Sequence, residues 1–506
     1  MDNPAVRFRL AASLTGNVIR TLISFATGLI VARALGPEIY GDYTFLLGSF
    51  AAIKLILDLG TSNAFFTFLS QRQRGPRFIA AYVAWQLLQF VLTLLIISIA
   101  LPQNWIHALW IGQPRGLVLL SFIAVFLQQQ AWTTLSQVGE AARLTAKVQA
   151  INVGVTLFHL LLVLPLAALE LISVPLLFAL IAGEYLIVIA LGWRWLSVQV
   201  PEPETFPWRE LLREYLKYCK PFFLYCLLGF LCSFADTWLL RNFGGARGMA
   251  YYSIASQFSG ISLLLVTSLV PVFWKEIAEA HHLGNHARVE RLHWKATRLV
   301  FVTGALVSGF LMPWSTDILR LLLGAAYEEG ALAVAIMFLY PLYVGVGQLG
   351  NAMLLATGRT RASVVIGGFF TVISIPVSYA IQAPPDAVLP GFELGAVGMA
   401  AKMALLVAIN VNVLLWWIAF ACGWRFDWAH QVFCLIWTIG SGWLCHAIVA
   451  GLGLSLAMPL PLQALLALVF YLAMTAAVVW FFPSVCGLTR AEMNRGLDLA
   501  KQLRLR

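Results

Sequence analysis

Two apolar stretches open the sequence: AASLTGNVIRTLISFATGLIVARAL at 11–35 and YTFLLGSFAAIKLILDLGTSNAFFTFL at 43–69. Both are longer than the roughly 20 apolar residues that an α-helix needs to cross a bilayer. Each stretch contains only two charged residues, and the segment Gly36–Asp42 lies between them. This pattern predicts two membrane-spanning helices joined by a short turn.

Stretches of this kind recur along the whole chain. Of its 506 residues, 60% are hydrophobic and 11% are charged, whereas about 25% of the residues in a soluble domain are charged. This composition excludes a soluble enzyme, a disordered chain and a nucleic-acid-binding module. Hydropathy predicts about 14 transmembrane helices, at 11–35, 43–69, 78–101, 116–138, 148–170, 172–195, 218–241, 248–273, 295–317, 331–357, 362–382, 395–421, 430–451 and 459–482. The expected fold class is therefore an all-α polytopic membrane protein.

The basic residues indicate how the chain is oriented. Lys and Arg number 33 and Asp and Glu number 23, which gives a formal net charge of +10. Cytoplasmic loops of membrane proteins collect Lys and Arg. With a cytoplasmic N-terminus, 25 of the basic residues fall in cytoplasmic segments and only 4 in outer segments. The distribution predicts a multi-pass protein with both termini in the cytoplasm, and it explains the net charge without a nucleic-acid partner.

Motifs for catalysis, nucleotide binding and metal binding do not stand out. The sequence has no GxxxxGK[ST] phosphate-binding loop, and its seven cysteines include no CxxC pair. His282 and His286 have the spacing of a metal-binding pair, but Gly284 and Asn285 between them argue against a firm helix. We therefore expect no enzymatic activity, no cofactor and no metal, and binding and translocation fit better than catalysis.

Two amphipathic segments lie outside the predicted spans. From Pro207 to Lys217, apolar residues occupy one helical face and basic residues the other, which is typical of a helix on a membrane surface. A capping box at Thr489–Glu492 opens a second such segment. We predict five parts: an N-terminal bundle at 1–195, an amphipathic cytoplasmic linker at 196–217, a C-terminal bundle at 218–421, two further helices at 422–482, and a cytoplasmic amphipathic tail at 483–506.

A short internal repeat relates the two predicted bundles. The first predicted span ends with RALG at 33–36 followed by Tyr43, and the seventh ends with RNFG at 241–244 followed by Tyr251, at a constant offset of 208 residues. Both tracts join the outer end of one span to the start of the next, so the repeat is parallel. Parallel repeats are a transporter architecture in which the substrate site lies between the halves.

Four basic residues lie inside predicted spans, namely Arg20, Arg33, Lys54 and Lys402. Each would cost roughly 2.5–3.5 kcal/mol at the bilayer centre, so we expect them to face a wet interior and to bind substrate. Arg33 can equally snorkel to the interface. Lys54 and Asp58 are four residues apart on one helical face and can equally neutralise each other.

Three acidic residues lie in the same environment. Asp58, Glu184 and Asp236 are the candidates for binding a coupling ion, and the sequence leaves open whether this ion is H+ or Na+. Asp236 can instead pair with Arg241, and Glu184 can instead be protonated and hydrogen-bonded. Several polar side chains could line the same interior or simply join helices by hydrogen bonds. They include Gln128, Asn152, His159 and Gln348.

Two tracts carry a family resemblance. GNVIRTLISFATGLIVARALGPEIYGDYTFLLGSF at 16–50 resembles the opening of Wzx-type polysaccharide transporters, which belong to the multidrug/oligosaccharidyl-lipid/polysaccharide exporter (MOP) superfamily. FADTWLLRNFGGARGMAYYSIASQFS at 234–259 resembles a second tract of that family. The resemblance implies two six-helix bundles forming a V around a central cavity, plus two C-terminal helices in some members, including the related lipid II flippases.

The resemblance also implies a function. Members flip polyprenyl-pyrophosphate-linked oligosaccharides, the repeat units of O-antigen, capsule or exopolysaccharide, across the bacterial inner membrane. The expected partners are this lipid-linked substrate, membrane lipids, H+ or Na+, and polymerases or glycosyltransferases. Two alternatives stay open: an ion-coupled multidrug or small-molecule antiporter of the same superfamily, and a membrane glycosyltransferase or polymerase. Four basic residues against three acidic ones within the spans favour an anionic substrate.

Overall fold

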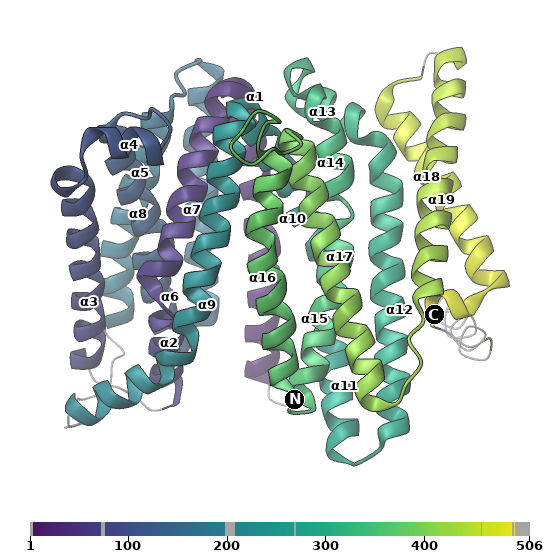
Figure 1. Cartoon of the computed structure of the whole chain (residues 1–506), viewed down its shortest axis with the longest axis horizontal. Coiled ribbons are helices and arrows are strands. Elements are labelled where there is room, and N and C mark those ends of the chain that lie inside the picture. Colours follow the sequence, from purple (N-terminus) through teal and green to yellow (C-terminus); the bar gives the residue numbers. More distant parts are fainter. Residues whose placement is uncertain are drawn as a thin grey trace. The chain divides into compact units, whose positions relative to one another are not determined.

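The computed structural model describes residues 4–71, 76–197, 208–267, 270–456, 458–487 and 490 (Figure 1). Of the described residues, 89% are helical and none is in a strand. Twelve helices in this part of the chain are long and apolar enough to cross a membrane. The predicted fold class, an all-α polytopic membrane protein, is confirmed, whereas the exact number of 14 helices is not.

The first of the twelve candidate spans, Ala11–Asp58, is 48 residues long because it runs through a sharp kink. It forms most of α1 (Pro4–Asp58), in which Gly36 is non-helical with φ 71° and ψ 167°. Glycine adopts positive φ without the steric penalty of a side chain. Pro37 follows directly, and its fixed φ suits the first turn of a helix. The turn predicted between the first two spans is therefore reduced to one glycine.

The predicted second span, 43–69, is not one continuous helix. α1 ends at Asp58, Leu59 and Gly60 adopt positive φ, and α2 (Thr61–Gln71) begins directly after them. The Asp58 carboxylate accepts hydrogen bonds from the Ser62 amide at 2.7 Å and the Thr61 hydroxyl at 3.2 Å. An acidic side chain in this position satisfies free amides at a helix start. The break therefore has a local cause that hydropathy cannot detect.

Internal packing divides the chain into two compact units. Unit one comprises Met1–Ser253 and Thr371–Gly395, and unit two comprises Ile254–Phe370 and Ala396–Arg506. All three boundaries fall within helices, namely α10 (Gly245–Thr267), α16 (Thr360–Gln382) and, after its first residue, α17 (Gly395–Cys422). The domain boundaries drawn from the sequence remain predictions.

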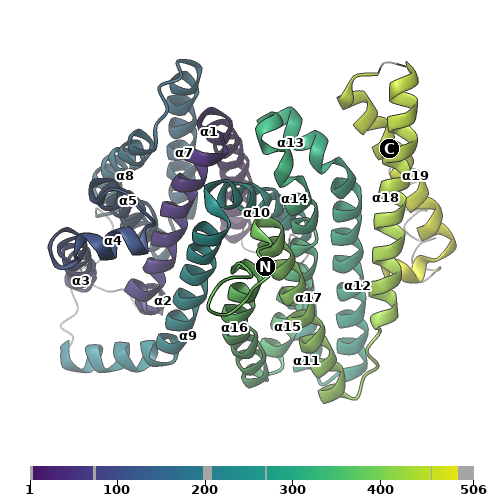
Figure 2. The ribbon, with the colours of Figure 1, turned by 45° about the horizontal axis from the view of Figure 1, so that its top comes forward.

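Unit one is built around α1, which packs along α7 and α9, while α5 packs against α8 (Figures 1 and 2). Two short π-helical segments, η1 and η2, extend helices of this unit. Besides α1, α2 and parts of α10 and α16, the elements are α3 (Pro76–Leu95), η1 (Ile96–Ala100), α4 (Gln103–Leu109), α5 (Arg115–Phe126), η2 (Leu127–Ala131), α6 (Trp132–Ala141), α7 (Thr145–Ala168), α8 (Val174–Ser197) and α9 (Trp208–Phe243).

The predicted amphipathic linker is partly described, as the first turns of α9. These turns lie across the direction of the rest of the helix (Figure 2), and α9 contains Pro221, a residue that kinks helices. The Tyr215 hydroxyl donates to the Thr61 carbonyl at 2.5 Å, and the Tyr218 hydroxyl lies 3.1 Å from Thr67 Oγ1. The two tyrosines therefore fix this segment to α2. Residues 198–207 of the linker and 491–506 of the tail lie outside the described residues.

Unit two is built around α12, which packs against α11, α15 and α18, while α19 packs against α18 (Figures 1 and 2). Besides parts of α10 and α16, its elements are α11 (Val270–His282), α12 (His286–Leu311), η3 (Met312–Trp314), α13 (Ser315–Leu323), η4 (Ala325–Gly330), α14 (Ala331–Met337), α15 (Tyr340–Ala356), α17 (Gly395–Cys422), α18 (Trp428–Leu456), α19 (Leu460–Phe481) and η5 (Pro483–Cys486).

The crossing of α12 and α18 depends on two glycines. A Cβ atom added to Gly442 would collide with the carbonyl oxygen of Gly309, and one added to Gly309 would lie 2.5 Å from the Thr438 carbonyl oxygen. Small residues let membrane helices approach at backbone distance. The contact leaves no room for a methyl group.

We expect Gly442→Ala to lower the thermal unfolding temperature in detergent, because the helices must separate; overpacking of this kind costs about 1–3 kcal/mol. The matched control is Gly440→Ala on the same helix, where an added Cβ meets no atom within 4 Å. Alanine is the better helix former, so the control should leave the midpoint unchanged or raised. Equal midpoints for the two variants would contradict the close crossing.

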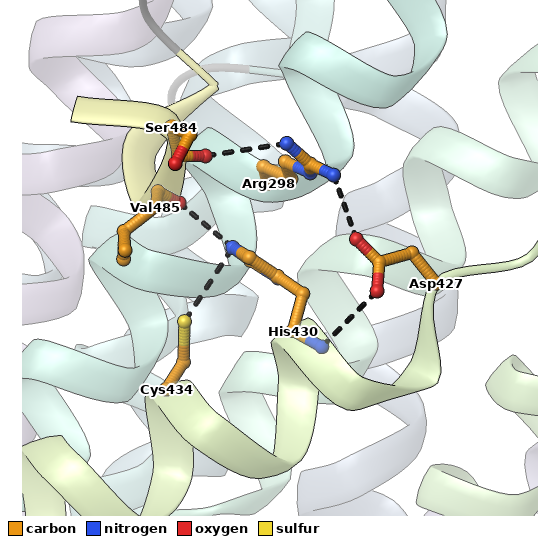
Figure 3. Close-up of polar contacts among 6 residues, drawn as sticks. All are labelled: Arg298, Asp427, His430, Cys434, Ser484 and Val485. Atoms are coloured by element: carbon orange, nitrogen blue, oxygen red, sulfur yellow. Dashed lines mark hydrogen bonds and ion pairs between the residues drawn. The ribbon is translucent and has the colours of Figure 1, made fainter. Parts of the chain in front are cut away.

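An ion-pair network fixes the start of α18 and the end of the described chain to α12 (Figure 3). Arg298 donates to Asp427 Oδ2 at 2.6 Å and to the Ser484 carbonyl at 3.2 Å. Asp427 Oδ1 accepts from the His430 amide at 3.2 Å, which caps α18. His430 Nε2 lies 2.7 Å from the Val485 carbonyl oxygen. These contacts attach α18 and η5 to the rest of unit two.

Candidate functional site

A buried ion pair within unit one brings together two residues from neighbouring helices. Nδ1 of His159 on α7 lies 2.9 Å from both carboxylate oxygens of Glu184 on α8. The Glu184 side chain is 4% exposed and that of His159 18%. Two ionisable groups at this depth are costly unless they share a proton or neutralise each other. An intramembrane pair of this kind is a candidate functional site.

Two tyrosines lie around this pair. Tyr43 on α1 interacts electrostatically with Glu184, and its ring lies 5.2 Å from that of Phe178. Tyr185, the residue after Glu184 on α8, lies near Gln128 of η2 and near Arg20 of α1. Helices α1, α7 and α8 and the segment η2 therefore contribute to one polar cluster. We call Arg20, Tyr43, Gln128, His159, Glu184 and Tyr185 the polar cluster.

The π-helical segment η2 orients the glutamines of this region. A π-helix carries one extra residue per turn, which redirects neighbouring side chains, and it is frequent at functional sites. Gln128 lies near Tyr185, whereas the buried Gln130 donates to Gln89 Oε1 at 3.0 Å. Gln89 in turn donates to the Leu57 carbonyl at 2.5 Å. Gln128 thus belongs to the polar cluster, and Gln130 belongs to a separate buried chain of hydrogen bonds.

Asn152, which is not part of the polar cluster, has a structural partner. The indole of Trp132, the first residue of α6, donates to Asn152 Oδ1 at 2.7 Å. An asparagine with its oxygen occupied still has its amide protons to offer. Asn152 can therefore join helices and contact a ligand at once, and both readings of the sequence remain open.

The other candidates on α1 are placed differently. Arg20 and Arg33 are exposed, and Lys54 is half-buried. The Asp58 carboxylate is occupied by Thr61 and Ser62, and none of the ion pairs recorded for the described residues joins it to Lys54. Asp58 is therefore a helix cap in this structure.

The remaining acid, Asp236, does not pair with Arg241. Its carboxylate accepts a hydrogen bond from the hydroxyl of Ser378 on α16. Arg241 instead forms an ion pair with Asp42 at 2.6 Å. In unit two, Lys402 on α17 is 2% exposed, and Gln348 on α15 is exposed. The binding and coupling roles suggested for these residues stay predictions.

Among the described residues, no group of three or more His, Cys, Asp or Glu side chains could hold a metal ion. The sequence did not single out His159, which was one of several polar side chains noted there. Glu184 lies 25 residues further along the chain, on another helix. No local spacing links the two, so their pairing depends on how α7 and α8 pack.

Comparisons with known proteins agree with this architecture. The MatE family model matches residues 221–380, and no curated protein matches the sequence. The structure of a lipid II flippase, MurJ, in an inward closed conformation is 14% identical with a TM-score of 0.66, and the match covers 92% of this chain and 98% of that one.

Two other solved structures also match. A multidrug resistance MATE family transporter in an inward-facing conformation is 18% identical with a TM-score of 0.60, covering 80% of this chain and 94% of that one. A MOP superfamily transporter from Pyrococcus furiosus is 16% identical with a TM-score of 0.54, covering 83% and 95%. At such identities the likeness establishes the fold. This chain is a multi-pass membrane protein with a MatE domain and the fold of MurJ and MATE transporters.

Proposed function

We propose that this protein flips a polyprenyl-pyrophosphate-linked oligosaccharide across the bacterial inner membrane by alternating access. The coverage of the structural matches supports this proposal most directly. The lipid II flippase match extends over 92% of the chain, whereas the MATE transporter match extends over 80%. The lipid II flippase thus accounts for more of this chain.

The cations of α1 provide independent chemical support. Arg20, Arg33 and Lys54 are carried by one kinked helix in a chain with only 11% charged residues. A diphosphate loses its hydration when it enters a membrane protein, and Arg and Lys donors offset that loss through charge-assisted hydrogen bonds. Arg20 also belongs to the polar cluster. A pyrophosphate-linked substrate would use these donors.

Flipping can be measured with purified protein in liposomes. A polyprenyl-pyrophosphate-linked saccharide is placed in the inner leaflet, and its appearance outside is followed by a membrane-impermeant enzyme that cleaves the exposed glycan. We expect exposure to accelerate when the protein is present. Protein-free liposomes and liposomes with an unrelated membrane protein give the background. Exposure at the background rate would contradict the proposal.

A multidrug antiporter is the second candidate, and the buried acid Glu184 favours it because organic cations pair with carboxylates. The same liposomes loaded with a cationic dye distinguish the two functions. Dye efflux driven by an ion gradient, with no flipping of the saccharide, would assign the protein to the antiporter class. Sugar incorporation by the purified protein without a partner would instead assign it to glycosyltransferases or polymerases.

The coupling ion that we propose is a proton, bound by Glu184 and His159. Sodium sites in proteins are built from several oxygen ligands, whereas both Glu184 oxygens lie against an imidazole nitrogen. A carboxylate and an imidazole at 2.9 Å can exchange one proton between them. Asp58 is occupied as a helix cap, which makes it a weaker candidate than Glu184 or Asp236.

Topology gives a further test. We expect both termini in the cytoplasm, with Gly36–Asp42 and the segment 383–394 outside, because the basic residues follow that arrangement. A phosphatase or fluorescent-protein reporter fused to the C-terminus reports its side of the membrane, and a fusion after residue 388 serves as the opposite control. A C-terminus outside the cytoplasm would overturn the orientation.

A further inference from the structure

The two repeat turns found in the sequence meet each other inside unit one. The first turn, with the kink at Gly36, belongs to α1, and the second joins α9 to α10 through Gly244 and Gly245. Gly36 and Gly245 both have a φ of 71°. α1 and α9 run side by side up to these turns (Figures 1 and 2). At the offset of 208 residues Gly36 corresponds to Gly244, so the glycine with positive φ comes one residue later in the second turn. The two segments that carry the repeat are nevertheless in contact.

The contact is built from opposite charges. Nη2 of Arg241 lies 2.6 Å from Asp42 Oδ1, and its Nε donates to the same oxygen at 2.9 Å. A second pair joins Arg247 to Glu38 at 2.9 Å. Both acids come from the first turn and both bases from the second. The side chain of Arg241 is 16% exposed, whereas those of Arg247 and Glu38 are 59% and 67% exposed.

The backbones also touch. A Cβ atom added to Gly41 would collide with the carbonyl oxygen of Ala246. Gly41 is therefore required for the turns to approach this closely. Two helical turns further along, a Cβ on Gly48 would lie 3.9 Å from the Met249 methyl, and Met249 is only 5% exposed. The contact covers Met249, which would become reachable if the turns separated.

We propose that the two repeat turns form a latch that closes the outer end of the transport path. Asp42 and Arg241 supply its attraction, and Gly41 supplies the space that lets it close. This proposal rests on the proposed function, because only a protein that alternates its access must open and close such an end. The predicted topology places both turns on the outer side.

The asymmetry of the repeat explains why the latch is releasable. At the offset of 208 residues, Arg33 corresponds to Arg241, but Asp42 corresponds to Ala250. If residue 250 were an aspartate, as strict symmetry requires, Arg33 could pair with it and two ion pairs would form. With alanine there, only the Arg241–Asp42 pair of the two forms. The side chains of Arg241 and Asp42 are 16% and 30% exposed, so solvent screens the pair only in part. One such pair holds the closed state without trapping the protein in it.

The test uses a full-length protein with its seven native cysteines replaced by serine and with Met249→Cys as a reporter. A membrane-impermeant maleimide applied to intact cells measures how often the reporter is exposed. We expect Arg241→Ala to raise the labelling rate about tenfold, because one charge of the pair is left unpaired. The exposed pair provides the matched control, and Arg247→Ala should change the rate by less than about threefold.

A steric test is independent of charge. Gly41→Ala should raise labelling at least about tenfold and lower transport by a similar factor, because the closed state can no longer form. Gly154→Ala on α7 makes the same substitution in the same unit, where an added Cβ meets no atom within 4 Å. It should leave both readouts at wild-type values.

Charge reversal completes the design. Asp42→Arg combined with Arg241→Asp should restore slow labelling, which neither single change does. Wild-type labelling in Arg241→Ala and Gly41→Ala, or fast labelling in the reversed pair, would overturn the latch. The labelling needs no substrate. If the labelling rates change as expected but the protein flips no saccharide, the proposed function is refuted and the latch is still supported.

Discussion

Glu184→Gln should uncouple transport from the proton gradient while leaving substrate binding intact. Glutamine keeps the shape of the side chain and can still hydrogen-bond to His159, but it cannot carry a proton. Moving one charge through 100 mV is worth about 2.3 kcal/mol, which corresponds to roughly a 50-fold accumulation ratio. We expect wild-type protein to accumulate substrate by roughly this ratio and Glu184→Gln protein to lose this accumulation. The measurement is transport in liposomes with an imposed pH gradient, repeated with a sodium gradient.

Glu140→Gln is the matched control, because Glu140 is also a carboxylate of unit one but lies near the end of α6, outside the polar cluster. It should behave as wild type. The second variant is His159→Gln, which should also weaken coupling if the pair carries the proton together. Wild-type protein that ignores every imposed gradient, or Glu184→Gln protein that still responds to pH, would show that the acid is structural.

Hydropathy predicted the helices well because lipid imposes one rule on every span. A spanning segment must be apolar, and its backbone N–H and C=O groups must hydrogen-bond to each other within the helix. Length and composition therefore suffice to detect it. The helix breaks obey other rules. The turn at Leu59–Gly60 interrupts a stretch that remains apolar on both sides, and its cause is the capping of α2 by Asp58. Hydropathy is blind to such a feature.

The candidate site was predicted less completely, because its contacts join distant parts of the chain. Glu184 stood out as a carboxylate in an apolar span, but His159 is its partner only because α7 packs against α8. Asp236, the nearest acid along the helix, was one possible partner of Arg241 on sequence grounds, whereas the structure joins Arg241 to Asp42, 199 residues away. Local spacing identifies the charged residues but does not reveal partners on other helices.

The pairing of Lys54 with Asp58 shows the same limit. Their spacing of four residues suits an ion pair on a helix, but the helix ends at Asp58, and the carboxylate turns toward Thr61 and Ser62. Lys54→Ala combined with Asp58→Ala should therefore not recover the activity lost in Lys54→Ala. Loss of the cap costs a further 0.5–2 kcal/mol, about what other helix caps contribute. Recovery of activity in the double variant would instead support the Lys54–Asp58 ion pair inferred from the sequence.

Arg20→Ala and Lys54→Ala should each reduce flipping of the lipid-linked saccharide. A hydrogen bond to a charged group is worth about 1.5–3 kcal/mol, so losing one donor to the diphosphate should weaken apparent affinity roughly tenfold to 150-fold. Arg20→Lys and Lys54→Arg keep the charge and should retain much of the activity. Arg213→Ala removes an exposed cation of unit one on α9 and should have no effect.

The readout must separate binding from folding. Each variant is first compared with wild type for its amount in the membrane and its unfolding temperature, and then for flipping rate against substrate concentration. A diphosphate site predicts a higher substrate requirement and an unchanged unfolding temperature. It also predicts weaker competition by free pyrophosphate, which shares the charge but carries no glycan. Full activity in both alanine variants would exclude these two cations from the substrate path.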